Sequence, residues 1–286
     1  MPSKPINVPE TLARIVAGVN AGEVIFPSTA EMAMKIQRVL DDPDCSTDQL
    51  AHLIQAEPLL ASRVVAVANS VVYNRSGQAV SNIKNAVARI GFKTLRVIAA
   101  SIVVRQMESM AETPEHARMA RKLWERTTHV AVLAHLIARR LTRQDPDTAF
   151  FAGIVHDVGG LYLIARAGRY PGLLEGGAGS LEHWFEGGAA ELGRAVLTRL
   201  NVPPNAMEAI EGLWRGELAI PPTSLGDTLL LATRLAPVDS PLDALAGEGR
   251  GNAPASLDMA VDADTLSGIL EESKEEVASL IGALYG

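Results

Sequence analysis

The stretch FAGIVHDVGGLYL, from Phe151 to Leu163, decides the fold, because it is a long apolar run that holds His156 and Asp157 side by side. It shows no alternation of apolar and polar residues between turn signals, so it is typical of a buried helical segment. An imidazole beside a carboxylate can begin a metal site, but a divalent metal takes roughly four to six ligands. The His-Asp pair alone therefore does not define an enzyme.

The glycines of this stretch have a structural interpretation. Gly153, Gly159 and Gly160 lack the preceding strand and the lysine that make a glycine-rich loop bind phosphate. We expect them to permit close packing of helices.

The rest of the chain predicts an all-α fold. Aromatic residues make up only 4% of the 286 residues, and apolar residues recur every three or four positions. Helix starts are marked by capping pairs such as Ser46 with Gln49, and prolines fall between the periodic stretches. No alternating stretch is bounded by hairpin turns.

Composition excludes several classes of function. The net charge of −7, with scattered Lys and Arg, gives no footprint for a nucleic-acid partner. The single cysteine, Cys45, excludes an internal disulfide and is typical of a reducing compartment. The longest apolar run, near Val97, falls short of the roughly 18 residues of a membrane span, and no signal peptide is evident. We therefore expect a soluble, cytoplasmic protein without membrane insertion.

The chain divides into three predicted regions. Residues 1–110 are expected to form an N-terminal helical lobe, and the polar linker Ala111 to Glu115 is a candidate boundary before a second helical bundle over 111–215. Residues 216–286 are expected to add further helices, one over 221–235 and an amphipathic one over 264–285. A Gly- and Pro-rich stretch at 239–254 predicts a mobile loop between them.

Four segments in order resemble the HDOD family of bacterial signalling proteins, relatives of the HD phosphohydrolases that typically lack their catalytic residues. They are the segment from Pro27 to Asn74, NAVARIGFKTLRVIAASIVV, LWERTTHVAVLAHLIARRL and FAGIVHDVGGLYLIA, and the resemblance covers about residues 12 to 215. It implies an N-terminal helical lobe packed on an HD-like bundle, with regulation through protein contacts in cyclic-dinucleotide, motility or stress signalling.

The resemblance also assigns the metal-ligand positions, and most of them hold the wrong residue. The first histidine position falls on Arg126, which only donates hydrogen bonds, and later positions fall on Ala189 and Thr233. His129, one turn after Arg126, could replace the histidine only in a shifted register. We therefore expect a degenerate HD site with no metal or cofactor, in which the Arg126 guanidinium pairs with Asp157.

Two functions stay open from the sequence: a non-enzymatic module that binds a protein partner, and a phosphohydrolase or nucleotide-binding protein with an unorthodox site. The segment from Val71 to Asn82 is the candidate recognition loop, because Tyr73 and Arg75 are residue types that anchor interfaces. Alternatively, Tyr73 packs under its own loop, and His183 is structural or exposed.

Overall fold

The computed structural model describes residues 6–23, 28–246, 268, 270, 271 and 274–285, without the side chains of 28–33. All regular structure in these residues is helical, which confirms the all-α prediction. The N-terminal part contains α1 (Val8–Asn20), α2 (Ser28–Leu40), α3 (Thr47–Gln55), α4 (Pro58–Ala68) and α5 (Ile83–Gln106). The remainder contains α6 (Pro114–Ile137), α7 (Pro146–Val155), α8 (Val158–Ala167), α9 (Ala189–Arg199), α10 (Pro204–Arg215), α11 (Leu225–Leu235) and α14 (Lys274–Tyr285).

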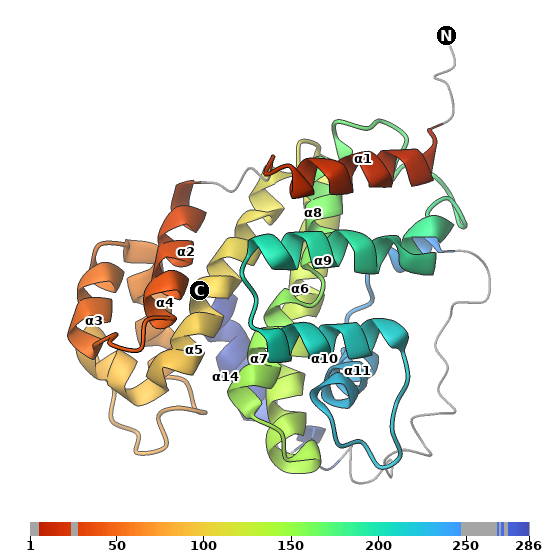
Figure 1. Ribbon diagram of the computed structural model, residues 1–286. Helices are drawn as coiled ribbons and strands as arrows, with labels where there is room; N and C mark the ends of the chain where they lie inside the picture. The colour runs from red at the N-terminus through yellow and green to blue at the C-terminus, as the bar shows by residue number, and fades with distance from the viewer. Residues whose placement is uncertain (1–5, 24–27, 247–267, 269, 272–273, 286) are drawn as a thin grey trace.

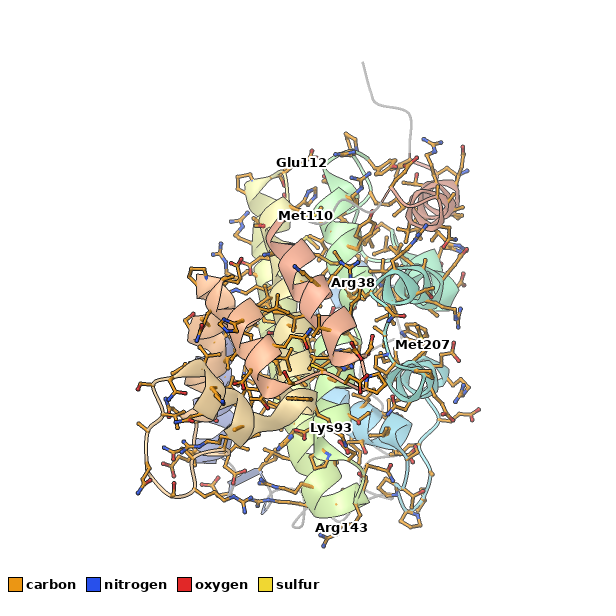
Figure 2. The ribbon with its side chains drawn as sticks, turned by 60° about the vertical axis from the view of Figure 1, so that its left-hand side comes forward. Arg38, Lys93, Met110, Glu112, Arg143 and Met207 are labelled. Atoms are coloured by element: carbon orange, nitrogen blue, oxygen red, sulfur yellow. The ribbon has the colours of Figure 1, made fainter. Side chains whose placement is uncertain are left out.

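Two groups of helices share one continuous core. The helices α2, α3 and α4 pack on α5, and α5 in turn packs on α7 of the second group, which is built around α6 (Figure 1). Figure 2 brings the first group to the front, with α1, α9 and α10 stacked beside it and seen nearly end-on. The two lobes therefore meet along α5.

The first helix does not belong to the N-terminal lobe that we predicted over residues 1–110. Instead, α1 lies across the second bundle and packs on α9, as Figure 1 shows. Its apolar stripe, which includes Leu12 and Val19, is buried there. In addition, Arg199 of α9 donates a hydrogen bond to the carbonyl of Val19 at 3.1 Å.

Local signals explain several helix boundaries. Ser46 accepts a hydrogen bond from the amide of Gln49 at 3.2 Å, as the capping pair predicts. The helix expected over 221–235 begins only at Leu225, because Ser224 and Asp227 form a reciprocal capping box. Of the helix expected over 264–285, the structure describes α14.

The first residues of the predicted mobile loop, 239–246, pack against the rest of the protein. Residues 239–246 follow α11 through turns and a 3-10 turn, Asp243–Leu245, and Leu242 and Leu245 are buried. The carbonyls of Leu245 and Ala246 accept hydrogen bonds from main-chain amides near Leu181. Residues 247–254 lie outside the described part of the chain.

The helices α7 and α8 belong to the buried core of the second bundle. The stretch Pro146–Ala167 is the one candidate in the described residues that is long and apolar enough to cross a membrane, but 89% of its most apolar window is buried inside the protein. It therefore has the burial expected of core helices.

Candidate functional site

The His156-Asp157 pair lies at the junction between α7 and α8. His156 is 7% exposed, and its Nδ1 lies 2.7 Å from the carbonyl oxygen of Gly153 in the preceding turn. Asp157 is partly buried and precedes the first residue of α8. An added Cβ at Gly160 would lie only 2.5 Å from Oδ1 of Asp157, so the glycine makes room for the carboxylate.

Close helix packing fixes this junction, as we expected for its glycines. A Cβ at Gly153 would lie 2.4 Å from the Cα of Ala131 on α6, and a Cβ at Gly159 would lie 2.9 Å from the Cα of Gly193 on α9. Real Cβ atoms do not approach so closely, so both positions need glycine in this arrangement. The junction is thereby held against both neighbouring helices.

Arg126 reaches the same region from α6, but it does not pair with Asp157. Its two terminal nitrogens donate to the carbonyls of Thr233, at 2.9 Å, and Val238, at 2.6 Å. Among the ion pairs within 4 Å that join described residues, none joins Arg126 to Asp157. The predicted pair is therefore wrong, because the carbonyls at and beyond the end of α11 take the guanidinium instead.

The electrostatics of the site follow from burial. Burial, together with the charge of Arg126, lowers the pKa of His156 to about 4, and the hydrogen bond to Gly153 opposes this shift. Burial also raises the pKa of Asp157 to about 7; Arg126 opposes this shift and Asp243 adds to it. At neutral pH, His156 is therefore uncharged and Asp157 is only partly ionised.

Asp243 is a residue of this site that the sequence did not reveal. It lies in the 3-10 turn after α11, and its pKa is raised by burial, while the charge of Arg126 opposes the shift. No local pattern marks Asp243, because its position depends on the path of the chain beyond α11. This path also supplies the Val238 carbonyl to Arg126.

The remaining sequence-predicted positions contribute no ligand. Ala189 is the first residue of α9 and offers only its main chain, and its carbonyl oxygen lies near Gly159. The hydroxyl of Thr233 donates to the Leu230 carbonyl at 2.9 Å. His129 is partly buried with Nδ1 3.0 Å from the carbonyl of Glu125, and His183 is exposed.

These residues do not fit a divalent metal. The guanidinium of Arg126 occupies the first expected histidine position, and the methyl group of Ala189 occupies the second. The expected aspartate position holds the hydroxyl of Thr233, which already donates to the Leu230 carbonyl. Within the described ranges, no three residues among His, Cys, Asp and Glu are grouped so that they could hold a metal ion.

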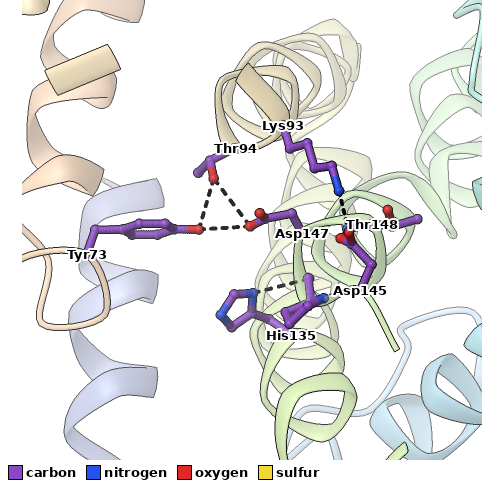
Figure 3. A network of polar contacts seen from close by, with 8 residues as sticks. Tyr73, Lys93, Thr94, His135, Asp145, Asp147 and Thr148 are labelled. Carbon is purple, nitrogen blue, oxygen red and sulfur yellow. Dashed lines mark hydrogen bonds and ion pairs between the residues drawn. The ribbon is translucent and has the colours of Figure 1, made fainter. Parts of the chain in front are cut away.

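The candidate recognition loop lies at the junction of the lobes, and Tyr73 points inward (Figure 3). Its hydroxyl lies 3.1 Å from the Thr94 hydroxyl on α5 and 3.2 Å from a carboxylate oxygen of Asp147 on α7. Burial and the Asp147 charge raise the tyrosine pKa. Tyr73 thus packs under its own loop, the alternative that the sequence left open, whereas Arg75 is exposed.

A second polar contact joins the lobes beside Tyr73. Lys93 of α5 forms an ion pair with Asp145, whose other carboxylate oxygen caps α7 by accepting from the amide of Thr148 at 2.8 Å. His135 of α6 lies in the same network, with Nδ1 3.2 Å from the Pro146 carbonyl (Figure 3). The junction therefore combines an apolar core with specific polar contacts between α5 and α7.

The architecture defines an all-α protein with an HD-like bundle and an accessory helical lobe. The HDOD domain family matches residues 26–214, and the chain belongs to this family. Comparison with curated proteins gave no match.

Solved structures share the fold at low sequence identity. A "putative metal-dependent phosphohydrolase" from Shewanella amazonensis is 23% identical, with a TM-score of 0.69, and the match covers 97% of this chain and 99% of that one. An HDOD domain protein from Geobacter sulfurreducens is 22% identical, with a TM-score of 0.64 and coverage of 96% and 98%. A "putative signal transduction protein" from Marinobacter aquaeolei is 20% identical, with a TM-score of 0.56 and coverage of 91% and 60%. At these identities the likeness concerns the fold alone.

Proposed function

We propose that this HDOD protein is a non-enzymatic module of bacterial signal transduction, which acts in the cytoplasm by binding another protein. The observation that carries the proposal is the position of Arg126. Its guanidinium reaches toward His156 and Asp157 at the first ligand position of an HD site and is held there by the Thr233 and Val238 carbonyls. A fixed positive charge at this point disfavours a metal cation and replaces part of the charge that a metal would give to Asp157.

Two further features support a binding role. The accessory lobe of α2 to α5 is a large addition beside the HD-like bundle and carries none of the residues at the HD positions. Its loop after α4 presents Val71, which is 42% exposed, and the exposed Arg75. We propose that the partner contacts this loop, in a pathway linked to cyclic dinucleotides as the family resemblance suggests, and that neither nucleic acid nor insertion into a membrane is involved.

The enzymatic part of the proposal is tested on the purified full-length protein. We expect substoichiometric iron, manganese, zinc and magnesium by mass spectrometry, and no turnover of cyclic dinucleotides or nucleoside phosphates. A stoichiometric metal that disappears in Asp157→Ala would contradict the proposal. Hydrolysis that His156→Ala abolishes would contradict it as well.

The partner surface is tested by cross-linked capture in cells of the native host. We expect Arg75→Glu to reduce capture at least tenfold, because it reverses a charge at the centre of the proposed contact. Arg118→Glu is the matched control, since Arg118 is an exposed arginine on α6 of the other lobe. Equal capture by both variants would show that the contact does not include this loop.

A further inference from the structure

A pocket opens where α4, the end of α5 and the end of α14 meet, and none of its lining residues belongs to the degenerate HD site. Its volume is about 380 Å³, within the range of roughly 300 to 1,000 Å³ that is typical of small-molecule sites. The lining includes the polar residues Arg63, Arg105 and Ser109 and the apolar residues Leu59, Ile102 and Leu284. We call it the Arg63–Arg105 pocket.

Two arginines bring positive charge to this pocket in a chain whose net charge is −7. Arg63 is only 4% exposed, and Arg105 is partly buried at the end of α5. Burial, together with the nearby charge of Arg105, lowers the pKa of Arg63 to about 10. The Arg63 guanidinium therefore stays protonated at neutral pH although Arg105 lies nearby.

The described residues supply these arginines with carbonyl oxygens rather than a carboxylate. Arg63 donates to the carbonyls of Ala283, at 3.3 Å, and Tyr285, at 2.9 Å, and Arg105 donates to the Tyr285 carbonyl at 2.7 Å. Of the described ion pairs, none includes either arginine; Glu108, at the pocket wall, pairs instead with Arg121 at 3.4 Å.

These contacts leave both charge and donors for another group. A guanidinium has five N–H donors, so three hydrogen bonds use a minority of the donors of two arginines. Carbonyls at a helix end carry only a partial negative charge. An anion in the pocket would therefore be attracted by both arginines.

Three of the lining side chains are apolar, and one of them is open to solvent. Leu59 is 41% exposed, whereas Ile102 and Leu284 are buried. A ligand that fills the pocket would therefore place an organic part against these three side chains, because this burial removes apolar surface from water.

We propose that the Arg63–Arg105 pocket binds a small phosphorylated molecule, with the phosphate on the two arginines and its apolar part against Leu59, Ile102 and Leu284. A phosphate monoester matches two guanidiniums better than a carboxylate does, since it carries more charge and a third acceptor oxygen. The proposal does not depend on the partner-binding role, because it concerns a separate pocket and is tested without a partner.

The test is a calorimetric titration of the full-length protein with phenyl phosphate, inorganic phosphate and benzoate. Phenyl phosphate is expected to bind at least tenfold more tightly than the other two, because only it offers both a dianion and an apolar ring. Tighter binding of benzoate would overturn the assignment of phosphate. Equal binding of inorganic phosphate and phenyl phosphate would overturn the role of the apolar side chains.

Two charge substitutions locate the site without removing an arginine. Leu59→Glu and Ser109→Glu each place a carboxylate at exposed lining positions, and each is expected to weaken phenyl phosphate binding at least tenfold. Ile220→Glu is the control, because Ile220 is 61% exposed and does not line the pocket. Unchanged affinity in a folded Leu59→Glu or Ser109→Glu protein, checked by circular dichroism, would overturn the proposal, as would an absence of binding in the unmodified protein.

Discussion

His156 and Asp157 are neighbours in the chain, but burial lowers the pKa of the histidine and raises the pKa of the aspartate. The two shifts have opposite effects on how the free energy of unfolding changes with pH. The folded pKa of His156 is lowered from 6.5 to about 4, so the unfolded chain binds more protons and stability rises over this pH range. The folded pKa of Asp157 is raised from 3.8 to about 7, so the folded chain binds more protons and stability falls as pH rises. The two contributions therefore nearly cancel in the unmodified protein.

Asp157→Asn should remove the falling contribution and leave the rising one. The free energy of unfolding of the variant, minus that of the unmodified protein, should therefore increase from pH 4 to pH 7, by up to about 4 kcal/mol. Urea denaturation at several pH values measures this difference. Asp44→Asn, at an exposed carboxylate, is the control and should change stability by less than about 0.5 kcal/mol. A difference for Asp157→Asn that is constant with pH would contradict the pKa shift.

At the residue scale, the sequence predicted which residues lie in the site, but it did not predict the contacts that they make. The resemblance placed Arg126, His156 and Asp157 in one region, and the structure brings them close enough to perturb one another. The partner of Arg126 was not predictable, because main-chain carbonyls have no sequence signature. Tyr73 was likewise ambiguous, since the same amphipathic side chain is suited to an interface and to a hydrogen-bonded position beneath a loop.

Between helices, the contact of α7 with α6 depends on the missing side chain of Gly153. Gly153→Ala would place a Cβ 2.4 Å from the backbone Cα of Ala131, so the helices would have to move apart. We expect a loss of about 1 to 3 kcal/mol of stability or more, because overpacking of a backbone contact is poorly relieved. Thermal and denaturant unfolding measure it.

Gly177→Ala is the matched control for this substitution. No atom would lie within 4 Å of the new Cβ at that position, so the change should stay within about 0.5 kcal/mol. Equal stability of the two variants would contradict the close packing at Gly153.

A different glycine effect is expected in α5, which joins the two lobes. Gly91 has φ 78° and ψ 170° inside this helix, so α5 consists of two helical segments that meet at a bend. No atom lies within 4 Å of a Cβ built there, so the constraint comes from the backbone alone. Gly91→Ala should cost about 1 to 3 kcal/mol in denaturant unfolding, because this conformation is nearly exclusive to glycine.

The control for Gly91 is a glycine in a regular and exposed helical position. Gly282→Ala in α14 should leave stability unchanged or raise it by up to about 1 kcal/mol, because alanine favours a helix. A Gly91→Ala protein as stable as Gly282→Ala would show that the bend is not required.

At the element scale, most helices were predictable and the bend and the placement of α1 were not. Apolar periodicity and capping residues such as Ser46 act locally, so they can be recognised in the sequence. The bend at Gly91 was not predictable, because the apolar pattern on either side of this glycine continues as in one helix. The apolar stripe of α1 indicates that the helix packs on another part of the protein, but it does not indicate whether that part is α9 or the N-terminal lobe.

At the scale of the whole molecule, α14 joins the two lobes, because it packs on α4 of one lobe and on α6 of the other. Leu280 on this helix is fully buried. Leu280→Ala should lower the free energy of unfolding by about 2 to 5 kcal/mol, as expected for a large-to-small change in a core. Amide hydrogen exchange should become faster in both α4 and α6.

Glu275→Ala provides the comparison on the same helix, because Glu275 is exposed. It should leave exchange in α4 and α6 nearly unchanged. Faster exchange confined to α14 in Leu280→Ala would contradict a role for this helix in joining the lobes.

The position of α14 also affects how the chain folds while it is being synthesised. The ribosome makes α4 and α6 well before Lys274 to Tyr285, so the surfaces that α14 covers have no partner when they first emerge. Such transiently exposed apolar surface favours aggregation and is the kind that chaperones bind. The nascent chain should therefore depend most on chaperones in the interval between completion of α11 and emergence of α14.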